Sequence, residues 1–404
     1  MIYLDNAATT FPKPSCMVRE MNRCMLSYCG NPGRSGHDMS MKTGEKVYEA
    51  RREIAGLFGI EDSSHIIFTY NATDSLNMAI KGVLKPGDHV ITTAMEHNSV
   101  LRPLKALEKA GIKNSIVRCS KSGYVSAAMI EREIQENTKL IICTHASNVV
   151  GSIQPVAAIG RMAREKGILF LVDASQSAGS VAIDVEDMNI DMMALPGHKG
   201  LLGPLGTGVL YIRPGLEPQL IRQGGTGTNS KELIQAEEFP EGYESGTVNA
   251  PGIIGLGESV KWIRQVGVER IGAYEGELVS RMEEHICTIN EIPASRDSIR
   301  LYGPAAYDIP KYDMAKYDIA KKKMPKTGIV CLNLRDRDCE EVSQLLNRSG
   351  IAVRAGFHCA GLAHKTIGTF DMGAVRLSVG PFNTKKEIDY TGEVLFRIAA
   401  GRLK

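Results

Sequence analysis

The chain repeats one pattern of hydrophobic and polar positions, in which a short apolar run ends in small polar residues and a longer segment follows. Such runs occupy residues 65–70, 89–93, 140–143, 168–172 and 192–195. A run that is apolar at nearly every position is typical of a strand buried on both faces. Because helix-length segments separate the runs, as at residues 155–166, the pattern predicts βαβ units and a mostly parallel sheet. We therefore expect an α/β fold.

Lys199 lies between two apolar runs, with His198 before it and glycines after it. This arrangement predicts a strand, a tight loop and a second strand, with the amine pointing inward. Burial lowers the pKa of a lysine, and the neutral amine is the nucleophile that attacks an aldehyde. A solvated loop lysine is the alternative. Asp173 favours the first interpretation, because it ends the run at 168–172 and so lies where ligands of an open α/β sheet bind.

Asp173 and Lys199 together suit one cofactor, pyridoxal 5'-phosphate. A carboxylate at this edge of a sheet can pair with the ring N–H of the cofactor and keep the ring protonated. Ala72 and Thr73 begin a predicted helix directly after the strand at 65–70. Free N–H groups at the start of a helix form a site for an anion such as phosphate. Helix capping alone explains Thr73 equally well.

Composition limits the classes of function. The chain has 404 residues, enough for two domains, and its 48 basic and 46 acidic side chains give no electrostatic reason to expect nucleic acid as a partner. No stretch reaches the length of a membrane helix, and no secretion signal precedes the first strand-like residues. Nine cysteines without framework spacing indicate reduced thiols in the cytoplasm. Cys16, Cys24 and Cys29 fit no common zinc pattern, so we expect no metal.

Three segments carry a resemblance to a known family: VDASQ at residues 172–176, GHKG at 197–200 and GPLGTG at 203–208. Together they resemble the class V aminotransferase superfamily, which are pyridoxal phosphate enzymes of fold type I, and within it the cysteine desulfurases and selenocysteine lyases. The resemblance extends from YLDNAATT at 3–10 to RLSVGPFNT at 376–384, nearly the whole chain. It implies a large domain around a seven-stranded sheet, a smaller α+β C-terminal domain, and a homodimer.

We expect the large domain to span residues 15–255 and the small domain to combine 1–14 with 256–404. Residues 305–326 interrupt the family pattern and contain three copies of a five-residue unit at 307–321. Five residues match neither the helix period nor the strand period, and three copies are too few for a solenoid. We interpret the segment as a surface insertion, with a partner-binding site as the alternative.

The resemblance also implies a role for each site residue. Lys199 forms a Schiff base with the cofactor, Asp173 pairs with its ring nitrogen, and His97 lies on the ring face and moves protons at the substrate's α-carbon. The other residues expected around the cofactor are Ala72, Thr73, Asn148, Gln176, His198 and Thr247, the last reaching the phosphate bound by the partner subunit. Those expected near the substrate are Arg376, Arg354, Asn148 and His37, with Arg376 gripping the carboxylate through two parallel hydrogen bonds.

Cys359 decides the chemistry that the resemblance implies. It follows Gly356 and His358 in a polar loop, where a thiol can be exposed and a nearby imidazolium can lower its pKa. The loop resembles that of the second group of cysteine desulfurases. The resemblance implies that L-cysteine, or alternatively L-selenocysteine, is the substrate. The Cys359 thiolate would then attack the substrate sulfur, alanine would leave, and the persulfide would pass to a protein acceptor.

Two departures from the family and several alternatives stay open. Pro196 stands where the family has a serine, so one phosphate contact is lost or is replaced by Thr226 or Thr228. Phe357 stands where many relatives have a first histidine, which leaves open how Cys359 is activated and whether sulfur or selenium is preferred. The alternatives to a cysteine desulfurase are a selenocysteine lyase, a class V aminotransferase or β-lyase acting on another amino acid, and a non-catalytic sulfur-carrier scaffold.

Overall fold

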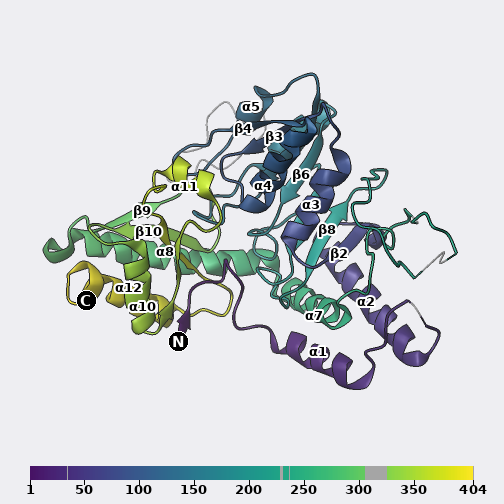
Figure 1. Cartoon of the computed structure of the whole chain (residues 1–404). Coiled ribbons are helices and arrows are strands. Elements are labelled where there is room, and N and C mark those ends of the chain that lie inside the picture. Colours follow the sequence, from purple (N-terminus) through teal and green to yellow (C-terminus); the bar gives the residue numbers. More distant parts are fainter. Residues whose placement is uncertain (34, 228–230, 236, 305–324, 404) are drawn as a thin grey trace.

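The computed structural model describes residues 1–404 except 34, 228–230, 236, 305–324 and 404 (Figure 1). The described chain forms a large α/β unit and a smaller unit of strands and helices, and the N-terminus lies with the smaller one. Helix α8 (Val268–Glu291) joins them, because Ile271 packs in the core of the large unit and Leu278 in the core of the small one. The repeats at 307–321 lie outside the described residues, as does the expected insertion apart from its last two positions.

A seven-stranded sheet forms the centre of the large unit, in the order β2-β8-β7-β6-β5-β3-β4. Neighbouring strands are parallel except for β8, which is antiparallel to both β7 and β2. The strands are β2 (Ile66–Thr69), β3 (His89–Thr93), β4 (Lys113–Val117), β5 (Thr138–Thr144), β6 (Leu169–Asp173), β7 (Met192–Pro196) and β8 (Gly208–Ile212). The predicted fold class is confirmed, and each apolar run overlaps one of these strands.

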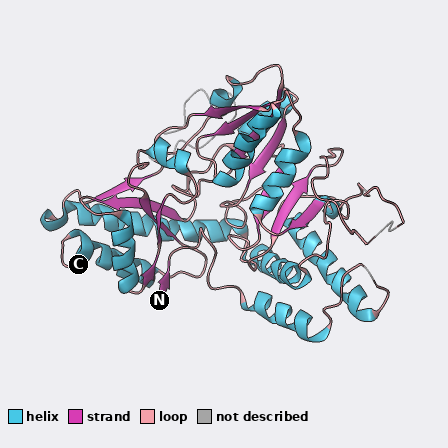
Figure 2. Ribbon diagram, in the orientation of Figure 1, coloured by secondary structure: helices cyan, strands magenta, loops and turns pink. Residues whose placement is uncertain are grey.

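Helices cover both faces of this sheet (Figure 2). In β7, Met193 and Leu195 face one apolar core, whereas Met192 and Ala194 face another. Because successive side chains of a strand point to opposite faces, a strand covered on both sides must be apolar at every position. The first core is closed by α2 (Asp38–Leu57), α5 (Ala127–Glu131), α6 (Val156–Glu165) and α7 (Ala250–Val266), and the second by α3 (Ala72–Val83) and α4 (Asn98–Leu107).

The small unit is built on a four-stranded antiparallel sheet in the order β12-β13-β10-β9. In chain order its strands are β9 (Ile299–Tyr302), β10 (Ile329–Leu334), β12 (Arg354–Gly356) and β13 (Ala374–Ser378). Among the described residues, its helices besides α8 are α10 (Cys339–Arg348), α11 (Gly361–Ile367) and α12 (Lys385–Ala399). The first residues of the chain belong to this unit, because β1 (Ile2–Tyr3) pairs in parallel with β11 (Ile351–Ala352).

The remaining elements of the described chain lie around the large unit, except for the 3-10 helix at Pro293–Ser295, which contacts α8 and α12 of the small unit. Helix α1 (Ser15–Ser27) packs on α7, where Met17 and Met21 lie against Gly255. Three short 3-10 helices are also present, at Ser63–His65, Glu108–Ala110 and Pro293–Ser295.

The expected domain boundary at residue 255 falls inside α7. Val260 and Ile263, which follow it, pack in the core of the large unit. The packing therefore favours a later boundary, within α8. The division into a large domain (15–255) and a small domain (1–14 and 256–404) stays a proposal, with the boundary at residue 255 moved to a position within α8.

A buried ion pair fixes the segment that leads to Thr247. Arg51 of α2 donates to both carboxylate oxygens of Glu244, at 2.7 and 2.9 Å, and its guanidinium lies over the ring of Phe68. Glu244 also accepts from the backbone N–H of Phe68 at 2.6 Å. The two charged side chains are only 7% and 9% exposed. Removing either partner would leave the other charge buried and unpaired.

We expect Arg51→Met to lower the free energy of unfolding by about 3–5 kcal/mol, because Glu244 would stay buried without its cation. Urea unfolding followed by circular dichroism measures this loss. Lys42→Met is the matched control on the same helix, since its exposed pair with Glu45 contributes about 1 kcal/mol at most. Equal losses in the two variants would contradict the role given to Arg51.

Candidate active site

The polar ends of the central strands surround a cavity of about 180 Å³. Parallel strands of one sheet place their carboxyl ends at the same edge, which is why residues distant in sequence meet there. The lining includes eight residues that the sequence analysis expected around a cofactor: Ala72, Thr73, His97, Asn148, Asp173, Gln176, His198 and Lys199.

Five expected site residues do not line this cavity: Arg376, Arg354 and Cys359, which belong to the small unit, and Thr247 and His37. Thr247 is exposed on the turn after Glu244 and lies outside the cavity. A residue that reaches the phosphate bound by a partner subunit would have to lie outside the cavity of its own chain. His37 begins α2 as its cap, where its Nδ1 accepts from the backbone N–H of Ser40 at 3.3 Å. Both roles stay predictions. Pro196 does line the cavity, whereas Thr228 lies outside the described residues.

Lys199 lies in the turn after β7, and its pKa is lowered to about 8. Burial is the main cause, and the charges of Arg376 and Arg354 lower it further, while Asp173 and Cys359 raise it. A large neutral fraction of the amine near pH 8 is what a nucleophile toward an aldehyde requires. These four charges also show that side chains from both units converge on this amine.

Asp173 ends β6 and is buried, with 3% of its surface exposed. One carboxylate oxygen accepts from the backbone N–H of Ser175 at 2.9 Å. Close behind it lies Glu96, a fully buried residue whose pKa is raised to about 8, mainly by burial. Glu96 is therefore protonated at pH 7, and its hydrogen bonds with Thr93 and Thr144 tie β3 to β5 beneath the cavity.

His97 caps the start of α4, and its ring is fixed by Ser99. The backbone N–H of Ser99 donates to Nδ1 of His97 at 3.0 Å, so a neutral ring carries its proton on Nε2. Burial first, then the charge of Lys199, lowers the pKa of His97 to about 4, so the ring is neutral at pH 7. The Ser99 hydroxyl also lies 2.8 Å from that of Thr73. Ser99 is not among the predicted site residues, although a serine two residues after a helix-capping histidine is a usable signal.

The N-terminal arm holds the lysine turn, which sequence analysis missed. The carbonyl of His198 accepts from the backbone N–H of Thr10 at 3.1 Å and from the amine of Lys13 at 2.7 Å. Burial lowers the pKa of Lys13 to about 8. Gln176 donates through its side-chain amide to the carbonyl of Ala7 at 2.9 Å. Residues of the arm therefore brace two sides of the cavity.

Arg376 of β13 is fixed between the two units and is only 1% exposed. Its Nη2 pairs with Asp5 at 2.9 Å, and its Nη1 donates to the carbonyl of Asn148 at 2.9 Å. Among the described residues, nothing accepts from its Nε. A buried guanidinium with an unused N–H is suited to a further anion.

Cys359 is exposed on the turn between β12 and α11. Its carbonyl accepts from the backbone N–H of Asn98 at 2.8 Å, and the carbonyl of His358 accepts from the side chain of Asn148 at 2.7 Å. His358 and Cys359 both adopt positive φ, 50° and 56°, which costs about 1–3 kcal/mol for each such residue. The bonds to Asn98 and Asn148 hold the strained turn against the cofactor-side residues.

The expectation that an imidazolium neighbours Cys359 is wrong. His358 is buried, and burial, with the charges of Arg376 and His364, lowers its pKa to about 2, so it is neutral at pH 7. The cation beside the thiol is Arg354, whose Nη2 lies 3.8 Å from Sγ. A guanidinium so placed can donate a hydrogen bond to the sulfur.

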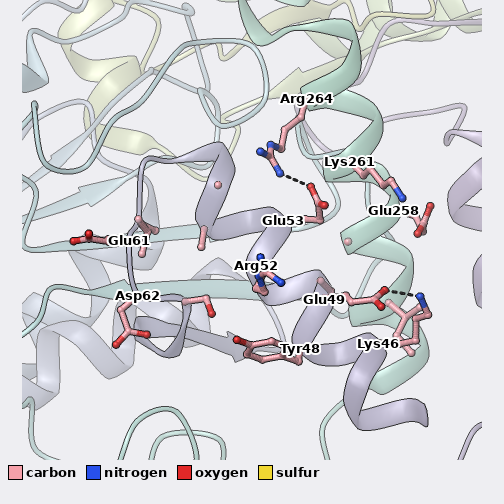
Figure 3. Close-up of a pocket in the computed structure, with 17 residues that line it drawn as sticks. Lys46, Tyr48, Glu49, Arg52, Glu53, Glu61, Asp62, Glu258, Lys261 and Arg264 are labelled. Carbon is pink, nitrogen blue, oxygen red and sulfur yellow. Dashed lines mark hydrogen bonds and ion pairs between the residues drawn. The ribbon is translucent and has the colours of Figure 1, made fainter.

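A larger hollow of about 780 Å³ lies between α2 and α7, lined by charged side chains (Figure 3). Lys46 pairs there with Glu49, and Arg264 pairs with Glu53. Opposite charges thus compensate each other, and none of the residues expected around a cofactor lines it. The smaller cavity, where the expected residues meet, is the candidate site.

Two further features of the described residues bear on the class of protein. No group of three or more histidine, cysteine, aspartate or glutamate side chains among them is arranged to hold a metal ion. None of their helices has both the length and the apolar character needed to cross a bilayer.

Comparison with known proteins defines the family. The model of the aminotransferase class-V family matches residues 2–308 and 305–391. The chain therefore belongs to the class V aminotransferase family, which confirms the resemblance seen in its motifs.

Within this family the chain belongs with the cysteine desulfurases. It is 34% identical over 405 residues to a probable cysteine desulfurase of Methanothermobacter thermautotrophicus, covering 98% of this chain and 94% of that protein. It is 32% identical to cysteine desulfurase IscS of Clostridium botulinum, covering 99% and 95% of the two chains. The apo structure of a cysteine desulfurase from Thermococcus onnurineus matches with a TM-score of 0.87 and 31% identity, over 99% of this chain and 95% of that one.

We expect Lys199 to capture an added aromatic aldehyde in proportion to its neutral fraction, which rises as pH passes through about 8. Salicylaldehyde trapped with borohydride and located by peptide mass spectrometry measures this on protein freed of small molecules. Asp173→Asn should move the midpoint to lower pH, because the Asp173 charge raises the pKa of Lys199. Lys42, whose bond to Glu45 raises its pKa, is the internal control. A midpoint near the ordinary value of 10.5 for Lys199 would contradict its burial.

Proposed function

We propose that this chain is a pyridoxal 5'-phosphate-dependent cysteine desulfurase that converts L-cysteine to L-alanine and keeps the sulfur as a persulfide on Cys359. The observation that carries the proposal is the place of this thiol. It is exposed, yet its loop bonds to Asn98 and Asn148, beside the cavity that Lys199 lines. An aminotransferase would need no thiol at this position.

The residues of the cavity fit pyridoxal 5'-phosphate. Lys199 offers an amine with a pKa near 8, Asp173 a buried carboxylate for the ring nitrogen, and His97 a neutral ring. The start of α3 at Ala72 offers backbone N–H groups for the phosphate, with Thr73 beside it. When bound, pyridoxal phosphate supplies an electron sink for the α-carbon of an amino acid. Pro196 offers no N–H, so the phosphate depends on the remaining donors.

Arg376 is the residue for the substrate carboxylate. Its guanidinium is already oriented by Asp5 and by the carbonyl of Asn148, and its Nε has no partner among the described residues. A carboxylate that binds with two parallel hydrogen bonds would use Nε and Nη2 and so share Nη2 with Asp5. One side-chain N–H of Asn148 is bonded to the carbonyl of His358, which leaves its second N–H and its oxygen for the cofactor or the substrate.

Cys359 takes the sulfur. A bond forms between its thiolate sulfur and the substrate sulfur while the bond from that sulfur to the substrate β-carbon breaks, and the electron pair stays with the carbon. The carbon skeleton gains a proton and leaves as L-alanine, so one L-cysteine and one enzyme thiol give one L-alanine and one persulfide without an outside oxidant. Arg354 donates a hydrogen bond to the attacking sulfur, and Lys199, which lines the cavity, moves the proton at the α-carbon.

The proposal extends to partners and compartment. An exposed persulfide on Cys359 can be reached by the thiol of a protein acceptor, which is the second substrate that the reaction needs. All nine cysteines are free thiols, which favours the reducing cytoplasm.

We also propose a homodimer. Apolar side chains stand exposed at the end of α1 and the start of α2, with Met25 54%, Leu26 85%, Met39 48% and Met41 63% exposed. A cluster of this kind on a water-facing surface is typical of an association site. Packing of a second copy against this apolar cluster would cover the cluster. The same packing would leave Thr247 free to reach the partner's phosphate.

We expect Cys359→Ala to lose alanine formation from L-cysteine. This loss tests the proposed function. Alanine and sulfide are measured with a reductant present, and L-selenocysteine is run alongside. We expect at least a hundredfold loss with L-cysteine, because no cysteine is among the described residues that line the cavity. Cys287→Ala, which removes an exposed thiol elsewhere on the surface, should keep full activity.

The other outcomes separate the alternatives. Retained turnover of L-selenocysteine by Cys359→Ala would mean that the thiol serves only the abstraction of sulfur. Wild-type protein that acts on neither substrate but transfers an amino group to a keto acid would reject the desulfurase in favour of an aminotransferase. Purified protein that binds no pyridoxal phosphate would favour a carrier scaffold.

For the dimer, we expect the double variant Leu26→Glu with Met41→Glu to sediment as a monomer, because two charges would have to be buried at the interface. Sedimentation velocity measures the change against the dimeric wild type. Ile116→Glu on the edge strand β4 is the control for an exposed apolar residue elsewhere. A double variant that still sediments as a dimer would place the interface on another surface.

A further inference from the structure

The turn that carries Cys359 places two neighbouring side chains in opposite directions. His358 and Cys359 both have positive φ, 50° and 56°, and while Cys359 is exposed, His358 is only 3% exposed. Residues other than glycine seldom adopt this conformation, so surrounding contacts must hold it. The outward direction of the thiol therefore depends on what holds His358 inward.

A line of hydrogen bonds runs behind His358. Its Nδ1 lies 3.1 Å from Nε2 of His364 in α11, and Nδ1 of His364 lies 2.7 Å from the hydroxyl of Thr369. On the other side, Nε2 of His358 lies 3.4 Å from the carbonyl oxygen of Arg354. His364 and Thr369 are fully buried. Water does not compete for these bonds.

The Arg354 carbonyl gives this line one direction. A carbonyl only accepts, so Nε2 of His358 carries the proton, and Nδ1 of its neutral ring accepts from Nε2–H of His364. Nδ1 of His364 must then accept as well, and the Thr369 hydroxyl donates to it. Burial lowers the pKa of His358 to about 2 and that of His364 to about 4, so both rings are neutral at pH 7.

We propose that Thr369 and His364 are positioning residues, which fix the tautomer of His358 and through it the placement of the Cys359 thiol. This inference rests on the proposed function for what the thiol does, and on geometry alone for how it is held. Phe357 supports the arrangement by packing edge-on against the ring of His364, with centroids 5.5 Å apart. His364, six residues beyond His358, thus supplies the ring that residue 357 does not.

Thr369→Val tests the proposal, because it keeps the shape of the side chain and removes only the hydroxyl. Nδ1 of His364 then loses its donor, and the alternative tautomer would turn an unprotonated Nε2 toward the unprotonated Nδ1 of His358. We expect kcat for alanine formation from L-cysteine to fall about tenfold or more with little change in KM, since a small displacement of a reacting group is costly. Amide hydrogen exchange over residues 356–361 should accelerate by a similar factor.

Thr369→Ser restores the hydroxyl and should restore both kcat and slow exchange. Thr391→Val is the matched control, a buried threonine whose hydroxyl bonds to Glu387 within α12, and it should leave the turn unchanged. Wild-type kcat and exchange in Thr369→Val, or equal losses in Thr369→Ser, would overturn the proposal. If Thr369→Val does not fold, His364→Phe is measured in its place. It should show the same fall in kcat and the same faster exchange, and wild-type values of both would overturn the proposal.

The exchange measurement also separates this inference from the proposed function. Faster exchange in Thr369→Val, in a protein whose wild type forms no alanine from L-cysteine, would support the positioning role and reject the desulfurase. Unchanged exchange in a protein that does form alanine would reject the positioning role alone.

Discussion

Parallel strands of one sheet end at the same edge, and the candidate site depends on this constraint. The strands β3, β5, β6 and β7 run in parallel, and His97, Asn148, Asp173 and Lys199 lie at their carboxyl ends or within a few residues after them. Each of these strands is held between two apolar cores. Because the strands cannot shift separately without disturbing both cores, the edge is rigid enough to keep a lysine amine buried.

The sheet edge supplies only part of the site, and the small unit brings the rest. Arg376 comes from β13 and Cys359 from the turn after β12. Both are attached to the large unit through backbone atoms, since Arg376 donates to the carbonyl of Asn148 and the carbonyl of Cys359 accepts from the N–H of Asn98. Movement of one unit away from the other would break both bonds together, so the residues for the substrate and those for the cofactor are assembled only when the units are packed.

Sequence patterns could predict the residues that follow strands, because a buried apolar strand and the polar residues after it are adjacent in one short segment. Lys199 and Asp173 are predicted in this way, and both line the cavity. Partners that meet only after folding left no such signal: Asp5 and Arg376 are 371 positions apart, and the carbonyl of His198 meets Lys13 across 185 positions. The ionisation of His358 could not be predicted for the same reason, because burial lowers its pKa and burial depends on α11 packing over it.

Burial first, and then the charges of the site, lower the pKa of His97 and of His358, so both rings are neutral at pH 7. Arg376, Arg354 and Lys199 lie near one another, and each contributes to lowering the pKa of a neighbour: Lys199 lowers that of His97, and Arg376 lowers that of His358 and of Lys199 itself. With Glu96 protonated at pH 7, few anions of the chain remain to balance them. Such a site favours ligands that bring negative charge, and a phosphate together with an amino acid carboxylate supplies it. Binding of these anions would in turn raise the pKa of Lys199, so the protonation of the amine is coupled to whether the anions are bound.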